Sequence, residues 1–169
     1  PENRQAAREA WLNAMAIWQR LEVAPVGPMG EMGKVAGGMD LRDEIYSWPG
    51  SNRCRVDQET EEQVYADVEA FKTELINVRG LDAIEQLLFV DDDDNHCAAN
   101  SKLNTSGAWA ALSSDEIRAQ RAGYAHTLAI ILLGNANALV EAWEGSFATS
   151  LATAGSGSAL FDTAHAGLN

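Results

Sequence analysis

The chain has 169 residues, of which 46% are hydrophobic and 22% are charged, a composition typical of a globular protein. Its 25 acidic residues outnumber its 12 basic ones, which gives a formal net charge of −13 at pH 7. This charge opposes binding to nucleic acid and to anionic membranes, and it favours cationic partners. The longest purely apolar run, 128–133, is far shorter than the roughly 20 residues that span a bilayer, so we expect no transmembrane segment.

The two cysteines bear on the compartment in which the protein works. One pair is compatible with either a reducing or an oxidising compartment, but Cys54 and Cys97 both lie in polar, loop-like stretches. Buried free cysteines usually have apolar neighbours, so we predict a Cys54–Cys97 disulfide and an extracytoplasmic location. The chain begins at Pro1 with no recognisable signal peptide, so we expect a form from which a targeting segment has been removed.

The first predicted element is an amphipathic helix over 2–21. Its larger apolar residues recur at spacings of four and three, the period of one helix face: Ala7, Trp11, Ala14, Trp18 and Leu21. We expect the tryptophans of this stripe to lie in the core. A loop rich in proline and glycine follows to about residue 39.

Two further helices are predicted before residue 76. The segment 40–49 reads as a short helix capped by Asp40 and stopped before Pro49, because proline disfavours helical geometry in its predecessor. Asp57 can cap a longer helix that runs to about residue 75 and carries an apolar stripe. The acidic residues of this segment would form its outer face: Glu59, Glu61, Glu62, Asp67 and Glu69.

The segment 79–89 combines a buried-helix pattern with two acids. Asp82 and Glu85 are three residues apart, so on a helix they emerge on one face with Cβ atoms roughly 5–6 Å apart. Like charges so placed need a cation, a shared proton or open water. On spacing alone, exposure to solvent competes with a metal or proton site.

An acidic run, 91–94, follows this helix. It fails the EF-hand pattern, since the sixth position counted from Asp91 is His96 and the twelfth is Lys102. We therefore predict a solvated acidic loop. A weaker alternative is a cation site to which His96 adds a nitrogen ligand.

The last long helix is predicted from a capping box of Ser113 and Glu116 and runs to about residue 150. No stretch alternates at period two for long enough to form a strand, so the fold class is all-α, an up-down bundle of long amphipathic helices with long irregular loops. We assign 1–150 to a first bundle. Residues 151–169 would be a linker and the start of a second bundle, with a helix beginning at about residue 159.

The commonest catalytic motifs are missing from the sequence: there is no His-Glu-x-x-His, Cys-x-x-Cys, Gly-x-Ser-x-Gly or Walker-type loop. Ferritin-like di-iron bundles need a Glu-x-x-His motif, which is also missing. We expect His126 to be a core or interface residue, and the Asp162–His165 pair is only a weak ligand signal. Carboxylates without an obligatory imidazole favour hard cations such as ferric iron, calcium or magnesium over zinc.

Several segments, taken in order, resemble the imelysin family. They are the run 45–49 with Asn52, Cys54, Val56 and Asp57; the run 80–85 with 87–89; and Cys97 with 143–145. The family's signature is Gly-x-His-x-x-Glu, in which Gly80 and Glu85 match while Asp82 stands at the histidine position. The resemblance covers roughly residues 7 to 150.

The resemblance implies an all-α protein of bacterial envelopes, periplasmic or a lipoprotein, built from two helical bundles and associated with iron uptake. The family was first classed as a metallopeptidase, an activity that is doubtful for most members. Asp82 at the histidine position puts a zinc-peptidase mechanism further in doubt. The implied partners are a second helical bundle, of the same protein or its other chain, and an iron-uptake partner.

Three hypotheses follow. The first is a non-catalytic protein that binds a metal ion, divalent or ferric, or an iron-related ligand through Asp82 and Glu85 of the Arg79-Gly80-x-Asp82-x-x-Glu85 motif; iron is favoured, with calcium or zinc as alternatives. The second is a metal-dependent peptidase in which Glu85 is the general base. The third is a structural or partner-binding module in which Arg79 and neighbouring helices neutralise the two acids through hydrogen bonds.

Overall fold

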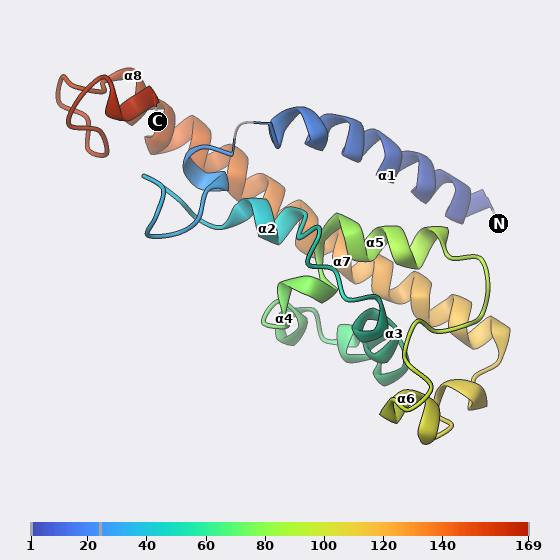
Figure 1. Cartoon of the computed structure of the whole chain (residues 1–169). Coiled ribbons are helices and arrows are strands. Elements are labelled where there is room, and N and C mark those ends of the chain that lie inside the picture. The colour runs from blue at the N-terminus through green and yellow to red at the C-terminus, as the bar shows by residue number, and fades with distance from the viewer. Residues whose placement is uncertain (1, 24, 169) are drawn as a thin grey trace.

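The computed structural model describes residues 2–23 and 25–168, and within them the secondary structure is helical, with no strand (Figure 1). The α-helices are α1 (Glu2–Leu21), α2 (Leu41–Ile45), α3 (Arg53–Glu62), α4 (Val68–Phe71), α5 (Gly80–Phe89), α6 (Lys102–Thr105), α7 (Ser114–Ala142) and α8 (Ala148–Ala152). Short 3₁₀ turns occur between them, and a π-helical segment, Trp143–Phe147, joins α7 to α8. The predicted all-α class is confirmed.

Three helices organise the molecule: α5 lies between α1 and α7 and packs against both. Figure 1 shows α1 and α7 running in the same direction and α5 running in the opposite one. The core around α5 brings together apolar residues of α3, α4, α5, α7 and two 3₁₀ turns: Val56, Tyr65, Phe71, Val78, Ala83, Ile84, Leu87, Leu88, Tyr124, Leu128 and Ile131. Burial of this set is the main driving force for the fold.

The tryptophans of α1 lie where the spacing predicts them. Trp18 is buried in a second apolar cluster with Met15 and Leu81, while Trp11 packs on its edge. The indole N–H of Trp11 donates a 2.7 Å hydrogen bond to the carbonyl of Leu81. This bond joins α1 to the first turn of α5, the turn that carries Asp82.

The long helix α7 begins as predicted. Ser113 and Glu116 form a reciprocal capping box, in which each side chain accepts from the other residue's backbone N–H. Residues 114–152 are long and apolar enough to cross a membrane by length and composition. That is weak evidence, because the core helix of a soluble protein passes the same test, so the lack of a transmembrane segment stays a prediction.

The predicted long helix over 57–75 is wrong. Helix α3 begins earlier, where the Asn52 side chain accepts from the backbone N–H of Arg55, and it ends at Gln63, which has a left-handed conformation (φ 54°). Asp67 then caps the separate short helix α4. Asn52 and Asp67 thus accept hydrogen bonds from nearby backbone N–H groups and start two separate helices, although the apolar residues of this segment have the spacing of one continuous helix.

The acidic outer face assigned to this segment is also partly wrong. Glu59 is fully buried and pairs with Arg55, at 2.6 Å, one turn away on α3. Burial raises the pKa of Glu59, and the neighbouring Arg55 opposes that rise. Asp57 is buried as well, so it caps nothing and instead contacts α5 and the loop before α6.

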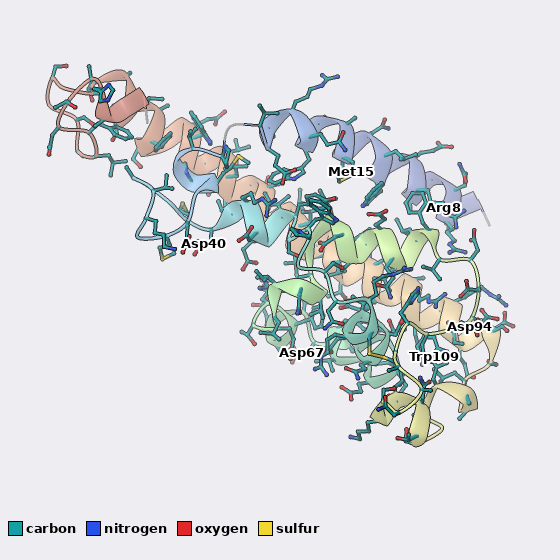
Figure 2. The ribbon with its side chains drawn as sticks, viewed as in Figure 1. Arg8, Met15, Asp40, Asp67, Asp94 and Trp109 are labelled. Atoms are coloured by element: carbon teal, nitrogen blue, oxygen red, sulfur yellow. A yellow bond between two sulfur atoms is a disulfide. The ribbon has the colours of Figure 1, made fainter. Side chains whose placement is uncertain are left out.

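Asp40 precedes α2 but does not cap it. It has a left-handed backbone (φ 57°), and its carboxylate accepts from the N–H of Met32 at 2.8 Å, across the glycine-rich loop. Figure 2 shows Asp40 where this loop meets α2. The prediction of a short helix is confirmed, and the prediction of its cap is wrong.

The helix predicted from about residue 159 is wrong. Within the described residues of this segment only the 3₁₀ turn Ala166–Leu168 is helical. The segment turns back on itself, and Phe161 is buried, with its ring 6.0 Å from that of Phe147. Burial of one aromatic ring against the π-helical segment competes with helix formation here. The division into domains at residue 150 stays a prediction.

The predicted disulfide is present: Cys54 and Cys97 are bonded, with a Cα–Cα distance of 4.4 Å. It ties the start of α3 to the irregular segment that precedes α6. In Figure 2 the bond between the two sulfur atoms lies beside α3. A buried polar cluster next to it holds the same two segments together.

Candidate functional site

The site begins at Gly80, the first residue of α5. Gly80 has a φ of +86°, a left-handed conformation that side chains disfavour. A Cβ there would lie 2.9 Å from the carbonyl oxygen of Ile45 and 3.0 Å from Oδ1 of Asp82. The glycine therefore lets the α2 end approach the first turn of α5, and it makes room for the Asp82 carboxylate.

Asp82 is nearly buried, with 6% of its surface exposed. Its Oδ2 accepts a 2.7 Å hydrogen bond from the hydroxyl of Ser47, while Oδ1 has no hydrogen-bond partner within the described part of the chain. Burial raises the pKa of Asp82, and the Ser47 hydrogen bond together with nearby backbone amides opposes that rise. Within the described residues, no cationic side chain forms an ion pair with the Asp82 carboxylate.

Glu85 lies one turn further along α5 and is exposed. Its pKa is raised by partial burial and then by the charge of Asp82, while Arg53 opposes the rise. The phenol of Tyr46 belongs to the same neighbourhood: its pKa is raised by burial and then by Glu85 and Asp82. Two carboxyl groups and a phenol therefore act on one another electrostatically, with the Ser47 hydroxyl beside them.

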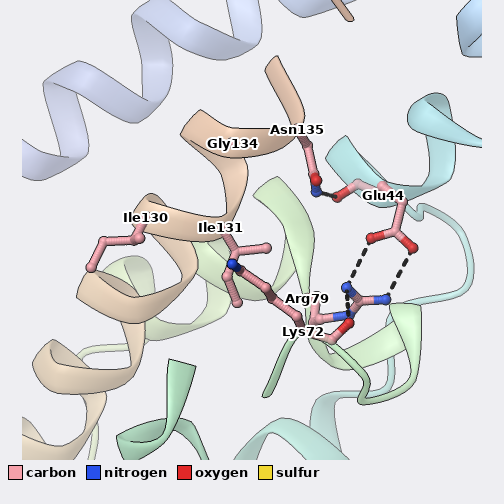
Figure 3. A pocket seen from close by; sticks show the side chains of 7 residues that line it. All are labelled: Glu44, Lys72, Arg79, Ile130, Ile131, Gly134 and Asn135. Atoms are coloured by element: carbon pink, nitrogen blue, oxygen red, sulfur yellow. Dashed lines mark hydrogen bonds and ion pairs between the residues drawn. The ribbon is translucent and has the colours of Figure 1, made fainter. Parts of the chain in front are cut away.

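Arg79 does not neutralise these acids, so that part of the third hypothesis is wrong. Its guanidinium makes a two-point ion pair with Glu44, at 2.8 and 3.0 Å, and also donates to the carbonyl of Lys72 at 2.9 Å (Figure 3). The pair faces a cavity of about 440 Å³ that is closed on its other side by α7, where Asn135 donates to the Glu44 carbonyl. Arg79 thus fixes α2 to the start of α5.

The opposite side of α5 holds a structural cluster. The Gln86 amide donates to Oδ1 of Asp57 at 3.0 Å, and the backbone N–H of His96 donates to Oδ2 at 2.7 Å. The His96 ring nitrogen Nδ1 also lies 2.9 Å from Oδ2. His96 is therefore engaged with Asp57 next to the disulfide, and does not extend the acidic run as the weaker alternative supposed.

The acidic run is held by arginines. Asp91 pairs with both Arg4 and Arg8, and it remains largely exposed. Arg121 donates to the carbonyls of Asp92 and Asp94, at 2.6 and 3.0 Å. The exposed Asp91 side chain agrees with the predicted solvated loop. The arginine contacts hold this loop against α1 and α7.

The two remaining histidines lie away from the carboxylate pair in sequence. His126 is exposed on α7, which rules out the core position, while the alternative of an interface residue stays a prediction. Asp162 and His165 are exposed in the C-terminal segment. Over residues 2–23 and 25–168, no group of three or more His, Cys, Asp or Glu side chains is placed to hold a metal ion.

The geometry therefore offers two carboxylates, supported by a phenol and a hydroxyl, which are all oxygen groups. Oxygen donors of this kind suit hard cations. With two acids, the site supplies only part of a coordination shell. Ser47 and Tyr46 were not predicted as site residues, although they stand in the run 45–49 that carries the resemblance; only the structure brings that run against α5.

Comparison with known proteins gives one match. The model of the family described as Imelysin, Peptidase_M75, matches residues 1–168, which is nearly the whole chain. No curated protein matches, and no solved structure matches.

Proposed function

Because the chain belongs to the imelysin family, we propose that it is an envelope protein that binds a hard cation, iron first among the candidates, through Asp82 and Glu85 without catalysing a reaction. The observation that carries this proposal is the Asp82 carboxylate. It is nearly buried, and its Oδ1 has no hydrogen-bond donor among the described residues. A buried carboxylate oxygen in that state gains free energy from a cation.

Glu85 supports the same reading. It lies one turn from Asp82, whose charge raises the pKa of Glu85, so an ion between the two would relieve a repulsion that the protein otherwise tolerates. Tyr46 and Ser47 add neutral oxygen atoms next to the pair. The rest of the coordination shell would come from water, from a chelating ligand or from the second helical bundle predicted above.

Two observations support an extracytoplasmic location. The family consists generally of extracytoplasmic proteins, and a disulfide suits an oxidising compartment. We place the protein in the periplasm or, as a lipoprotein, at the outer membrane. A role in iron uptake belongs to the same proposal.

The test is metal retention. The purified chain is loaded separately with Fe³⁺, Ca²⁺ or Zn²⁺, dialysed and subjected to elemental analysis. We expect about one Fe³⁺ per chain in the unmodified protein and a loss of at least tenfold in the double variant Asp82→Asn/Glu85→Gln.

A matched control is available on another helix. Glu141 and Glu144 have the same spacing of three and are both exposed. The variant Glu141→Gln/Glu144→Gln should retain as much Fe³⁺ as the unmodified chain. Equal retention by the Asp82/Glu85 variant would contradict the proposal.

One observation favours a second candidate function, a metal-dependent peptidase. The raised pKa of Glu85 is the direction that suits a general base or acid near neutral pH. Cleavage of a peptide library that requires added metal and disappears in Glu85→Gln would select this function. Metal retention without any cleavage would select the non-catalytic one.

A further inference from the structure

The connection between α2 and α3 is bonded to α5 at both of its ends. Near its start, the hydroxyl of Ser47 donates to Asp82 at 2.7 Å. Where it enters α3, the backbone carbonyl of Arg53 accepts a hydrogen bond from the Gln86 amide at 2.9 Å. Because Glu85 directly precedes Gln86 on α5, the Arg53 end of the connection lies beside the second acid of the proposed cation site.

Arg53 brings a cation to this place without an anion of its own. Its side chain is exposed and takes part in no ion pair or hydrogen bond within residues 2–23 and 25–168. Its charge nevertheless acts on Glu85. Burial and the charge of Asp82 raise the pKa of Glu85, and Arg53 is the group that opposes the rise.

Two other arginines near the site already have carboxylate partners. Arg42 pairs with Glu22 and with its neighbour Asp43. Arg79 makes its two-point ion pair with Glu44. These two guanidinium groups are therefore not available to an added anion, in contrast to the one at the start of α3.

The start of α3 adds positive charge at the same place. Arg53 is the first residue of this ten-residue helix, and the Asn52 side chain accepts from the backbone N–H of Arg55 at 3.0 Å. In the part of the chain that the structure describes, no hydrogen bond uses the N–H of Arg53 or Cys54. The positive end of a helix dipole favours an anion. The independent indication of a ligand is Oδ1 of Asp82, which is buried and has no partner among the described residues.

These charges distinguish a bare ferric ion from a chelated one. Asp82 and Glu85 balance two of the three positive charges of Fe³⁺. An ion bound by Glu85 also removes the attraction between Glu85 and Arg53, and it leaves Arg53 facing a positive charge, which opposes binding of the bare ion.

The coordination shell leads to the same choice. Among the described residues, no third His, Cys, Asp or Glu side chain joins the two acids in a metal-binding group, so positions on the ion remain for an added ligand. A chelator with several carboxylates supplies the missing oxygen donors and the missing negative charge together. A hydroxamate chelator supplies oxygen donors but has no carboxylate to pair with Arg53.

From this arrangement we propose that the site takes Fe³⁺ as an anionic polycarboxylate chelate. Asp82 and Glu85 coordinate the ion, and the guanidinium of Arg53 pairs with a carboxylate of the chelator at the start of α3. A guanidinium matches a carboxylate in a two-point geometry that a lysine cannot reproduce. The inference rests on the proposed function, because it requires that Asp82 and Glu85 bind the ion.

The test is equilibrium dialysis of the unmodified chain with ferric citrate that is radiolabelled in both its iron and its citrate. Citrate is the probe because it is a small polycarboxylate chelator. We expect about one iron and about one citrate to be retained per chain, and citrate retention should weaken as salt rises. Ferric acetohydroxamate, which carries no carboxylate, is the comparison donor, and iron retained from it reports the ion site alone.

Variants of one arginine locate the chelator. Arg53→Gln should lower citrate retention at least tenfold, while iron retained from ferric acetohydroxamate should not fall. Arg53→Lys keeps the charge without the two-point geometry and should lose less citrate than Arg53→Gln. Arg20→Gln, the same change at an exposed arginine of α1, is the matched control and should leave both retentions unchanged.

The two donors separate failure of this inference from failure of the proposed function. With iron still retained from acetohydroxamate, three outcomes would overturn the chelate proposal and leave the cation site standing. They are iron retained from ferric citrate without citrate, citrate retained without iron, and full citrate retention by Arg53→Gln. If the unmodified chain retains no iron from either donor, the cation site and the chelate proposal both fail.

Discussion

At the scale of single residues, Asp82 combines burial with a lack of compensating charge. Ser47 donates to one of its oxygens, whereas Arg79, the nearest cation in the sequence, pairs with Glu44. Arg79 is close to Asp82 in the sequence, yet its guanidinium pairs with Glu44 and not with Asp82. An acid in this position costs stability when it is ionised, a cost that is common at functional sites.

The first prediction concerns the pH dependence of stability. Because the pKa of Asp82 is raised in the folded chain, its contribution to stability is fully present below the ordinary value of 3.8 and is lost as pH rises through the folded value. Asp82→Asn should therefore raise the free energy of unfolding at pH 7 by on the order of 1 kcal/mol. Urea denaturation of metal-free protein at pH 7 and pH 3 measures the change.

The same comparison has a control. Glu141→Gln removes an exposed carboxylate from α7 and should leave the free energy of unfolding within about 0.5 kcal/mol at both pH values. The advantage of Asp82→Asn should vanish at pH 3. A loss of stability in Asp82→Asn at pH 7 would contradict the account of Asp82 as a costly buried acid.

At the scale of elements, the site depends on how α5 begins. Gly80 allows the close approach of the Ile45 carbonyl, Arg79 fixes α2, and Trp11 of α1 bonds to the Leu81 carbonyl. Two other helices, α1 and α2, therefore meet the first turn of α5. The N-terminus of α5 has no local side-chain capping hydrogen bond. Its position is therefore fixed by these tertiary contacts.

The second prediction tests this turn. Gly80→Ala adds a Cβ at a positive φ and 2.9 Å from the Ile45 carbonyl, so it should lower the free energy of unfolding by about 1–3 kcal/mol. Gly134→Ala is the matched control, because a Cβ there meets nothing within 4 Å in the middle of α7. It should raise the free energy of unfolding by about 0.5–1 kcal/mol. Thermal and urea unfolding of both variants check the opposite signs.

The third prediction concerns the disulfide. Cys54 and Cys97 close a loop with a sequence separation of 43. The double variant Cys54→Ser/Cys97→Ser should lose about 2–4 kcal/mol of unfolding free energy, because its unfolded chain is less constrained. Urea denaturation measures this loss, and reduction of the unmodified protein should reproduce it. An unchanged denaturation midpoint would show that the Asp57 cluster alone holds the two segments.

The sequence was most informative where helical spacing and local caps agree. The spacing on α1 and the Ser113–Glu116 box predict two long helices correctly, since both signals are local. The stripe over 57–75 misleads, because the backbone turns at Gln63 and Asp67 while its apolar residues still reach one core. Asp82 and Glu85 could be selected by spacing, whereas Ser47, Tyr46 and Glu44 reach α5 only through tertiary contacts.

At the scale of the whole molecule, three helices leave two distinct faces. The first turn of α5 presents Asp82 and Glu85, and the groove between α1 and α7 has an apolar floor of α5 side chains. The net charge of −13 favours cations at the first of these faces. Imelysin-family proteins are generally extracytoplasmic, and the disulfide suits such a location.

The central claim is that Asp82 and Glu85 bind a cation, and anomalous X-ray diffraction from iron-soaked crystals tests it most directly. The account predicts an anomalous peak between Oδ1 of Asp82 and the carboxylate of Glu85, within about 2.5 Å of each. The peak should be missing in crystals of Asp82→Asn/Glu85→Gln. Soaked crystals with no peak at this position, or with one only at the exposed acidic run 91–94, would contradict the claim.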